Sequence, residues 1–303
     1  MNKLLFTLST LIIATSCADD MTRYDALEGE EIRATVHMQD FTYDDDTRTT
    51  LSLGEEGLSF AWNDDDLIGV FPIYPEPNSQ ARKAIKTIEN CQDGHYAEFN
   101  GGGWLLNRSY TYSAYYPYNG KLPISTNYDE IPIKMEGQAQ TGNGSTSHLG
   151  KYDFMCAPST FVTTKRPDGS DCIVAFDFKH LVAIWQVTVL TNGIAAEWSH
   201  MAITNTDGKE VFTTEARMNT STCEVTPTAS ASHMDLTLND IVTTTEDQYI
   251  TLFISVLPAE TGNISLSLFT ADGEEYTAPL TSKSLTAGRA TRSVAYELNR
   301  KAE

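Results

Sequence analysis

The chain has 303 residues, of which 41 are Asp or Glu and 21 are Lys or Arg, so its formal net charge is −20. A surface this acidic repels nucleic-acid phosphates, and the sequence holds no basic patch or nucleic-acid-binding motif, which excludes a nucleic-acid-binding protein. The length allows two domains.

The first predicted element is a signal peptide. Lys3 supplies a positive charge, and residues 4–15 form an apolar run shorter than the roughly 20 residues that a membrane-spanning helix needs. The run ends in small residues before Cys17, a pattern that resembles the bacterial lipobox and implies cleavage before Cys17 and acylation of this residue. Two or more acyl chains anchor a protein stably. The alternative is an ordinary signal peptide with an incidental cysteine.

Short alternating runs separated by turn signals dominate the rest of the chain and predict β-sandwiches. The Asp-Gly pairs within Asn205–Gly208 and Ala271–Gly273 favour hairpin turns, because they tolerate positive φ. The best helix candidate is short, at Gln80–Ile88. The clearest strand runs are 110–116, 174–178, 250–256 and 264–268.

Composition divides the chain into segments. Residues 137–150, rich in Gly, Ser and Thr, predict a long loop, and residues 163–171 predict a linker between domains. We therefore expect four segments in chain order: a lipoprotein signal peptide at 1–16, a polar tether at 17–32, an N-terminal β-sandwich at 33–165 and a C-terminal β-sandwich at 166–303.

Four cysteines besides Cys17 lie far apart without a CxxC motif, which argues against a zinc site. An exported chain can join them into disulfides with three possible connectivities. Burial as small apolar residues is an equal alternative, because a domain of this size forms a core without crosslinks. The four are Cys91, Cys156, Cys172 and Cys223.

Four segments stand out together in the chain: Arg48-Thr49, Phe60–Phe71, Tyr152–Ala157 with Val174–Ala183, and Leu285–Arg289 leading into Ser293–Leu298. In this order they resemble the fimbrillin family, the lipoprotein pilins of Gram-negative gut and oral anaerobes. The second segment contains a tryptophan, an acidic turn and an Ile-Gly-Val-Phe strand, in which Asp65 stands where the family more often has Gly. Gly69 in that strand predicts a close approach by a neighbour, and His180 in the third segment resembles a recurring structural histidine at the edge of the core.

This resemblance implies an all-β protein with two transthyretin-like β-sandwich domains in tandem. Family members that polymerise lose an N-terminal strand to a protease that cuts after an arginine, and a strand of the next subunit fills the groove. Arg48 is the best candidate for the cut, and Arg33 and Arg23 are weaker candidates. The alternative is that Arg48 is an exposed loop arginine and that the strand is retained.

The C-terminal run that contains Val294, Tyr296 and Leu298 alternates and is a candidate donor strand. It fits an ordinary last strand of the second sandwich equally well. Trp104 and Tyr116 belong to an aromatic cluster that is a candidate glycan contact, although strand-spaced aromatic residues more often pack in cores.

No catalytic motif occurs in the chain, and the six histidines never fall at metal-ligand spacing. The sequence therefore predicts no enzyme, no cofactor and no metal site. We expect a fimbrial subunit or accessory tip component, lipid-anchored in the outer membrane at the cell surface, whose partners are other fimbrial subunits and a surface receptor or glycan. The alternative is a carbohydrate-binding surface lipoprotein that does not polymerise.

Overall fold

The computed structural model describes residues 32–38, 41–43, 58, 61–63, 66–74, 82–86, 96–101, 110–122, 126–162, 173–295 and 297–301. In this part of the chain every regular element is a strand except η2 (Leu149–Lys151), a single 3-10 turn. The all-β class predicted from the sequence is confirmed. Within the same residues, no helix is long and apolar enough to cross a bilayer.

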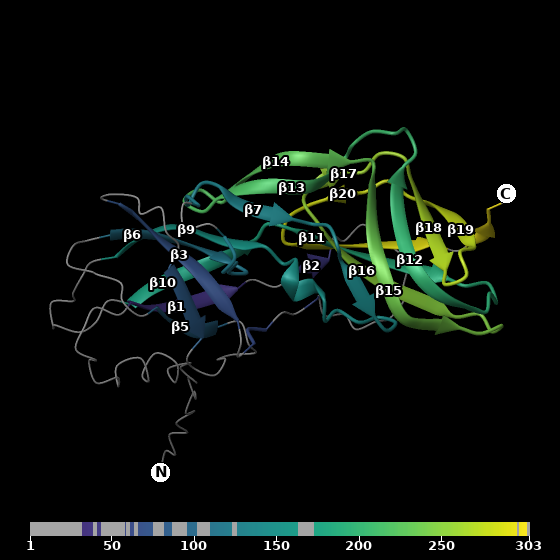
Figure 1. The fold of residues 1–303 in the computed structure, drawn as a ribbon, viewed down its shortest axis with the longest axis horizontal. Coiled ribbons are helices and arrows are strands. Elements are labelled where there is room, and N and C mark those ends of the chain that lie inside the picture. The colour runs from purple at the N-terminus through teal and green to yellow at the C-terminus, as the bar shows by residue number, and fades with distance from the viewer. Residues whose placement is uncertain are drawn as a thin grey trace, which may run out of the picture.

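Seven strands close into a barrel at one end of the molecule (Figure 1). Its strands come from both halves of the sequence, so the first and the tenth strand of the chain lie side by side. In the order of their pairing the strands are β1 (Ile32–Met38), β10 (Ile173–His180), β9 (Met155–Val162), β6 (Tyr110–Tyr116), β3 (Leu67–Tyr74), β4 (Arg82–Lys86) and β5 (Tyr96–Gly101).

Two larger sheets form the other end of the molecule (Figure 1). The four-stranded sheet contains, in order, β16 (Tyr249–Val256), β11 (Ala183–Leu190), β21 (Arg289–Ala295) and β2 (Thr42–Tyr43). The six-stranded sheet contains β22 (Asn299–Arg300), β19 (Glu275–Leu280), β18 (Ile264–Thr270), β12 (Ala196–Asn205), β15 (His233–Thr243) and β8 (Ala139–Thr141).

A three-stranded sheet lies along one side of the molecule, between its two ends (Figure 1). It contains β14 (Glu224–Ala231), β13 (Phe212–Asn219) and β7 (Ile131–Lys134). A two-stranded ribbon pairs β17 (Ala259–Glu260) with β20 (Ser284–Leu285).

The buried residues form two separate cores. One fills the barrel and is built around Trp62, which makes edge-to-face contacts with Phe99, Tyr116 and Phe178. The other joins the two large sheets and continues onto the outer face of the barrel through side chains such as Phe71. The outer face of the barrel therefore packs as a core surface against its neighbours.

The alternation predicted from the sequence matches the burial. Every second residue of 264–270 is buried, and the even-numbered residues of 250–256 are all fully buried. Both Asp-Gly turns form with glycines at positive φ, +72° at Gly208 and +92° at Gly273.

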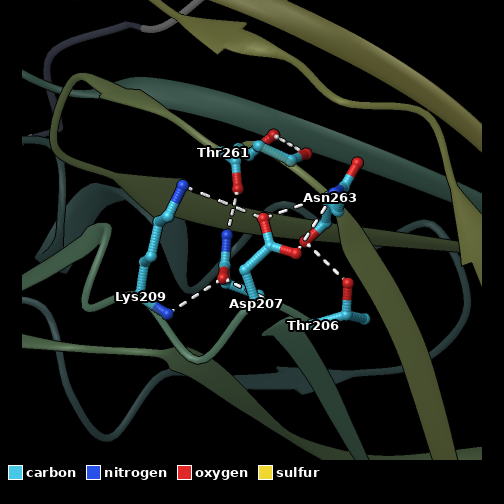
Figure 2. A network of polar contacts seen from close by, with 7 residues as sticks. Thr206, Asp207, Lys209, Thr261 and Asn263 are labelled. Carbon is cyan, nitrogen blue, oxygen red and sulfur yellow. Dashed lines mark hydrogen bonds and ion pairs between the residues drawn. The ribbon is translucent and has the colours of Figure 1, made fainter.

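The first of these turns is fixed by a polar network that Figure 2 shows. The side-chain oxygen of Asn205 accepts hydrogen bonds from the backbone N–H groups of Asp207 and Lys209, each 3.0 Å long. The same amide donates to the backbone oxygen of Thr261 at 2.8 Å, and the side-chain amide of Asn263 donates to Asp207 at 3.2 Å. The network joins the turn after β12 to the loop between β17 and β18. Its role is therefore structural.

Two predictions from the sequence differ from the structure, one of them only in part. Residues 82–86 form strand β4 instead of a helix, because pairing with β3 and β5 outweighs local helix propensity. Residues 137–150 are not a structureless loop, since they contain β8 and the start of η2.

Strands on either side of the expected domain boundary at 165/166 pair with strands on the other side. β10 follows the boundary but lies in the barrel, whereas β7 and β8 precede it and pair with β13 and β15. The linker at 163–171 falls outside the described residues, and the division into two tandem sandwich domains stays a prediction.

The structure joins two of the cysteines. Cys156 on β9 and Cys223 in the turn between β13 and β14 form a disulfide, with Cα atoms 5.6 Å apart and 67 residues of separation in sequence. Near it, the hydroxyls of Ser113 and Thr220 lie 2.7 Å apart. The barrel is thereby crosslinked to the three-stranded sheet. Cys91 and Cys172 lie outside the described residues.

Gly69 provides a test of the packing, because the close approach predicted there is confirmed. A Cβ atom on Gly69 would lie 2.0 Å from Cε1 of Tyr115, whose ring is buried. Gly69→Ala should therefore lower the free energy of unfolding by about 1–3 kcal/mol through overpacking, measured by urea denaturation. Gly150→Ala is the matched control, since no atom lies within 4 Å of the added Cβ. Equal stability of both variants would contradict the packing described here.

Candidate functional site

Strand β1 closes the barrel, because it pairs on both of its sides. It runs parallel to β10 from the Arg33–Ile173 pair to the Met38–Phe178 pair. On its other side it runs antiparallel to β5 from Ile32 to His37. Without β1, the facing edges of β10 and β5 would both present unpaired backbone N–H and C=O groups.

The segment that follows β1 reaches the four-stranded sheet. Phe41 is fully buried, and its ring centroid lies 3.9 Å from that of His180. Strand β2 then runs parallel to the beginning of β21, with Thr42 opposite Arg289. The Arg289 guanidinium donates a hydrogen bond to the Thr42 hydroxyl. Residues 32–43 therefore contribute strands to two different sheets.

A buried polar pair lies beneath Phe41. Nδ1 of His180 and Oδ1 of Asp153 are 2.6 Å apart, and their side chains are 1% and 2% exposed. Buried polar groups need such partners, so the structural role predicted for His180 agrees with this contact.

The opposite edge of the four-stranded sheet, at β16, is covered by side chains. Gln138, Gln140 and Asn143 place their amides along β16 as a neighbouring strand would place its peptide groups. Gln138 shows the pattern: its Oε1 accepts from the Ser255 N–H at 2.8 Å, and its Nε2 donates to the Ser255 carbonyl at 2.7 Å. A primary amide can do this because it carries both donor and acceptor.

The remaining members of this amide cap repeat the arrangement along β16. Gln140 and Asn143 accept hydrogen bonds from backbone N–H groups and donate to backbone carbonyls of alternate β16 residues, and the His148 ring bonds one further carbonyl. These contacts are Phe253 N–H to Gln140, Gln140 to Thr251 O, Thr251 N–H to Asn143, Asn143 to Tyr249 O, and His148 to Phe253 O, at distances between 2.7 and 3.0 Å.

The backbone of the same segment, residues 139–142, forms hydrogen bonds with the six-stranded sheet. Strand β8 pairs in parallel with β15, and the Gly142 N–H extends this pairing to the Asn239 carbonyl at 2.9 Å. The segment thus closes one side between the two sheets. Side chains of residues 138–143 cover the edge at β16. The N-terminal segment, residues 32–43, covers β10, β5 and the beginning of β21.

Few of the site residues predicted from the sequence fall in this region. Arg33 lies on β1, and Val294 lies on β21 opposite Thr188 of β11. Leu298 is buried in the core that joins the large sheets. Cys17, Arg23, Arg48, Trp104 and Tyr296 lie outside the described residues.

Tyr116, the other predicted glycan contact, is 8% exposed. Its hydroxyl donates to Asp66 at 2.8 Å, and its ring packs edge-on against Trp62. The ring therefore faces the barrel interior and is not presented to solvent. Among the described residues, no three His, Cys, Asp or Glu side chains are arranged to hold a metal ion.

The amide cap was missed in the sequence because Gly and Ser surround it and suggest a loop. The signal that could have found it is the spacing of Gln138 and Gln140. Two amides two residues apart, beside a short strand, point to the same side of the chain.

A family model described as fimbrillin-like matches residues 47–302. Among solved structures, a candidate cell adhesion protein of Bacteroides ovatus has a TM-score of 0.55 at 17% identity, covering 90% of this chain and 96% of its own. That likeness shows the fold. A candidate cell adhesion protein of Bacteroides eggerthii has a TM-score of 0.39 at 9% identity, covering 90% of this chain and 89% of its own. No curated protein matches the chain.

The amide cap can be tested by Gln138→Met, which keeps the volume but removes both hydrogen bonds to Ser255. The change also removes the bond that Gln138 donates to the Met135 carbonyl at 3.0 Å. Each buried backbone group left unpaired costs about 1–3 kcal/mol, so the unfolding free energy should fall by at least about 2 kcal/mol in urea denaturation. Gln248→Met is the control, because the side chain of Gln248 accepts one exposed hydrogen bond, from the Thr244 backbone N–H. If both variants lose equally little, the amides do not hold the edge.

His148 should make the cap sensitive to pH. Burial lowers the pKa of His148 from its usual 6.5, although the hydrogen bond to the Phe253 carbonyl opposes the shift. Its Nδ1 is buried without a partner among the described residues, so a proton there is unfavourable. Because the folded pKa is lowered, the stability gained from neutral His148 is present above pH 6.5 and is lost as pH falls through the folded pKa.

His148→Gln, which can still donate to the Phe253 carbonyl, should remove this loss. Urea denaturation at pH 7.5 and pH 5.0 should show a smaller drop in unfolding free energy for the variant than for the parent chain. Equal drops in both proteins would contradict the assignment.

Proposed function

Because this chain belongs to the fimbrillin-like family, we propose that it is a fimbrial subunit or accessory tip component that acts in adhesion at the cell surface and assembles by strand exchange. The observation that carries the proposal is that residues 32–43 supply β1 to the barrel and β2 to the four-stranded sheet. A detachable N-terminal segment that covers two sheets is what an exchange mechanism requires.

The position of the cut decides what is released. A cut after Arg48 frees a fragment that contains both β1 and β2, whereas a cut after Arg33 leaves most of β1 attached. A cut after Arg23 leaves both strands attached. Only the first cut uncovers β10, β5 and the beginning of β21 together, which favours Arg48 as the processing site.

A donor strand from the next subunit would then restore the lost backbone hydrogen bonds. It would replace six residue pairs with β10 and six with β5. The C-terminal run of Val294, Tyr296 and Leu298 is the candidate donor. Val294 pairs with β11 in this structure, so donation would require β21 to leave that neighbour.

The amide cap supports strand exchange at the N-terminal segment by closing the opposite edge of the four-stranded sheet. Since Gln138, Gln140 and Asn143 occupy the β16 edge, an incoming strand cannot pair there without displacing them. The β16 edge is thereby closed to an incoming strand, whereas the edges that the N-terminal segment vacates would be open to one.

The remaining parts of the proposal concern location and chemistry. Cys17 carries the acyl chains that hold the chain in the outer membrane, after removal of residues 1–16. The protein is structural and adhesive, not catalytic, and its partners are other fimbrial subunits and a surface receptor. The alternative is a subunit that keeps β1 and β2 and binds carbohydrate without polymerising.

Limited digestion with an arginine-specific protease tests the exchange. The purified chain should convert from monomer to ladders that resist mild detergent, and Arg48→Ala should abolish them, because β1 and β2 stay in place. Arg33→Ala is the matched control and should assemble as the parent chain does. Ladders from Arg48→Ala would refute this cut site, and a parent chain that is cut but stays monomeric would refute strand exchange.

A further inference from the structure

A hollow of about 320 Å³ lies between the outer face of the barrel and β7. None of its lining residues belongs to β1, β2 or β21, so it is separate from the strand-exchange edges. Its volume is in the range of sites for small ligands. The lining residues with exposed surface include Tyr118, Phe154, Asn119, Lys134 and Lys151.

Aromatic side chains form the apolar part of the wall. Tyr118 and Phe154 are partly buried and pack against the core, so each keeps some exposed ring surface. The ring centroids of Tyr115 and Tyr118 lie 6.3 Å apart at an interplanar angle of 42°, so the buried Tyr115 ring supports Tyr118. The exposed parts of Tyr118 and Phe154 can pack against the C–H groups of a sugar.

Two lysines stand at the hollow in an otherwise acidic chain. Lys134 forms an ion pair with Glu215, with 2.7 Å between Nζ and Oε1. Lys151 is exposed and forms no ion pair among the described residues. One ammonium group is thus available for an anion, while the net charge of −20 disfavours polyanions such as nucleic acids.

We propose that this hollow binds a sugar that carries a carboxylate, such as a hexuronate residue of a surface glycan. The carboxylate pairs with Lys151, and the apolar face of the sugar stacks on Tyr118 and Phe154. Stacking supplies contact area, and the charged hydrogen bond supplies selectivity. This gives the adhesive subunit a binding site away from its assembly edges.

Saturation-transfer NMR and calorimetry on the uncleaved full-length chain test the site with two probes. Methyl galacturonoside and methyl galactoside share the ring and differ only in the carboxylate. The acidic sugar should bind about tenfold more tightly, and Lys151→Gln should remove this difference, because the charged hydrogen bond is lost. Lys179→Gln, a change at an exposed lysine on β10, is the matched control and should bind as the parent does.

Absence of binding by either sugar, equal binding of both, or unchanged affinity in Lys151→Gln would overturn the proposal. Each of these results is independent of the ladder assay, because the uncleaved chain is used.

Discussion

Backbone hydrogen bonding at the edges of the sheets is the constraint on which the rest of this structure depends. A strand edge with unpaired N–H and C=O groups is costly when buried and promotes association when exposed. The chain meets this constraint in different ways at two places. At β16 it uses amide side chains from residues 138–143, and at β10, β5 and the beginning of β21 it uses strands from residues 32–43. The amide side chains lie within the body of the chain and stay in place after a cut at Arg48. The covering strands β1 and β2 both lie on the N-terminal side of that cut.

The N-terminal segment contributes to the stability of the monomer as well as covering strand edges. The core that joins the large sheets includes Phe41 from the N-terminal segment, and the His180–Asp153 pair lies directly beneath it. Loss of the segment would expose apolar and polar groups together with strand edges. A second subunit that supplies a strand would cover all three, so assembly would restore contacts that the folded monomer already makes.

Much of the fold could be predicted from local patterns. Alternation identified the strands at 110–116, 250–256 and 264–268, and Asp-Gly pairs located two turns, because these features depend on neighbours in sequence. Strand β4 and the amide cap could not be predicted, since both depend on distant partners. Residues 82–86 are strand because β3 and β5 flank them, and Gln138 is a cap because Ser255, 117 residues away, needs a partner. The hollow beside β7 combines residues from 115 to 154, and the sequence clustered the tyrosines without indicating which of them reach solvent.

Hydrogen–deuterium exchange before and after removal of residues up to Arg48 tests the central claim most directly. If the N-terminal segment is the detachable cover, the amides of β10 and β5 will lose protection after the cut, while those of β16, held by the amide cap, will keep it. Unchanged protection in β10 and β5, or equal loss along the whole chain, would contradict the account.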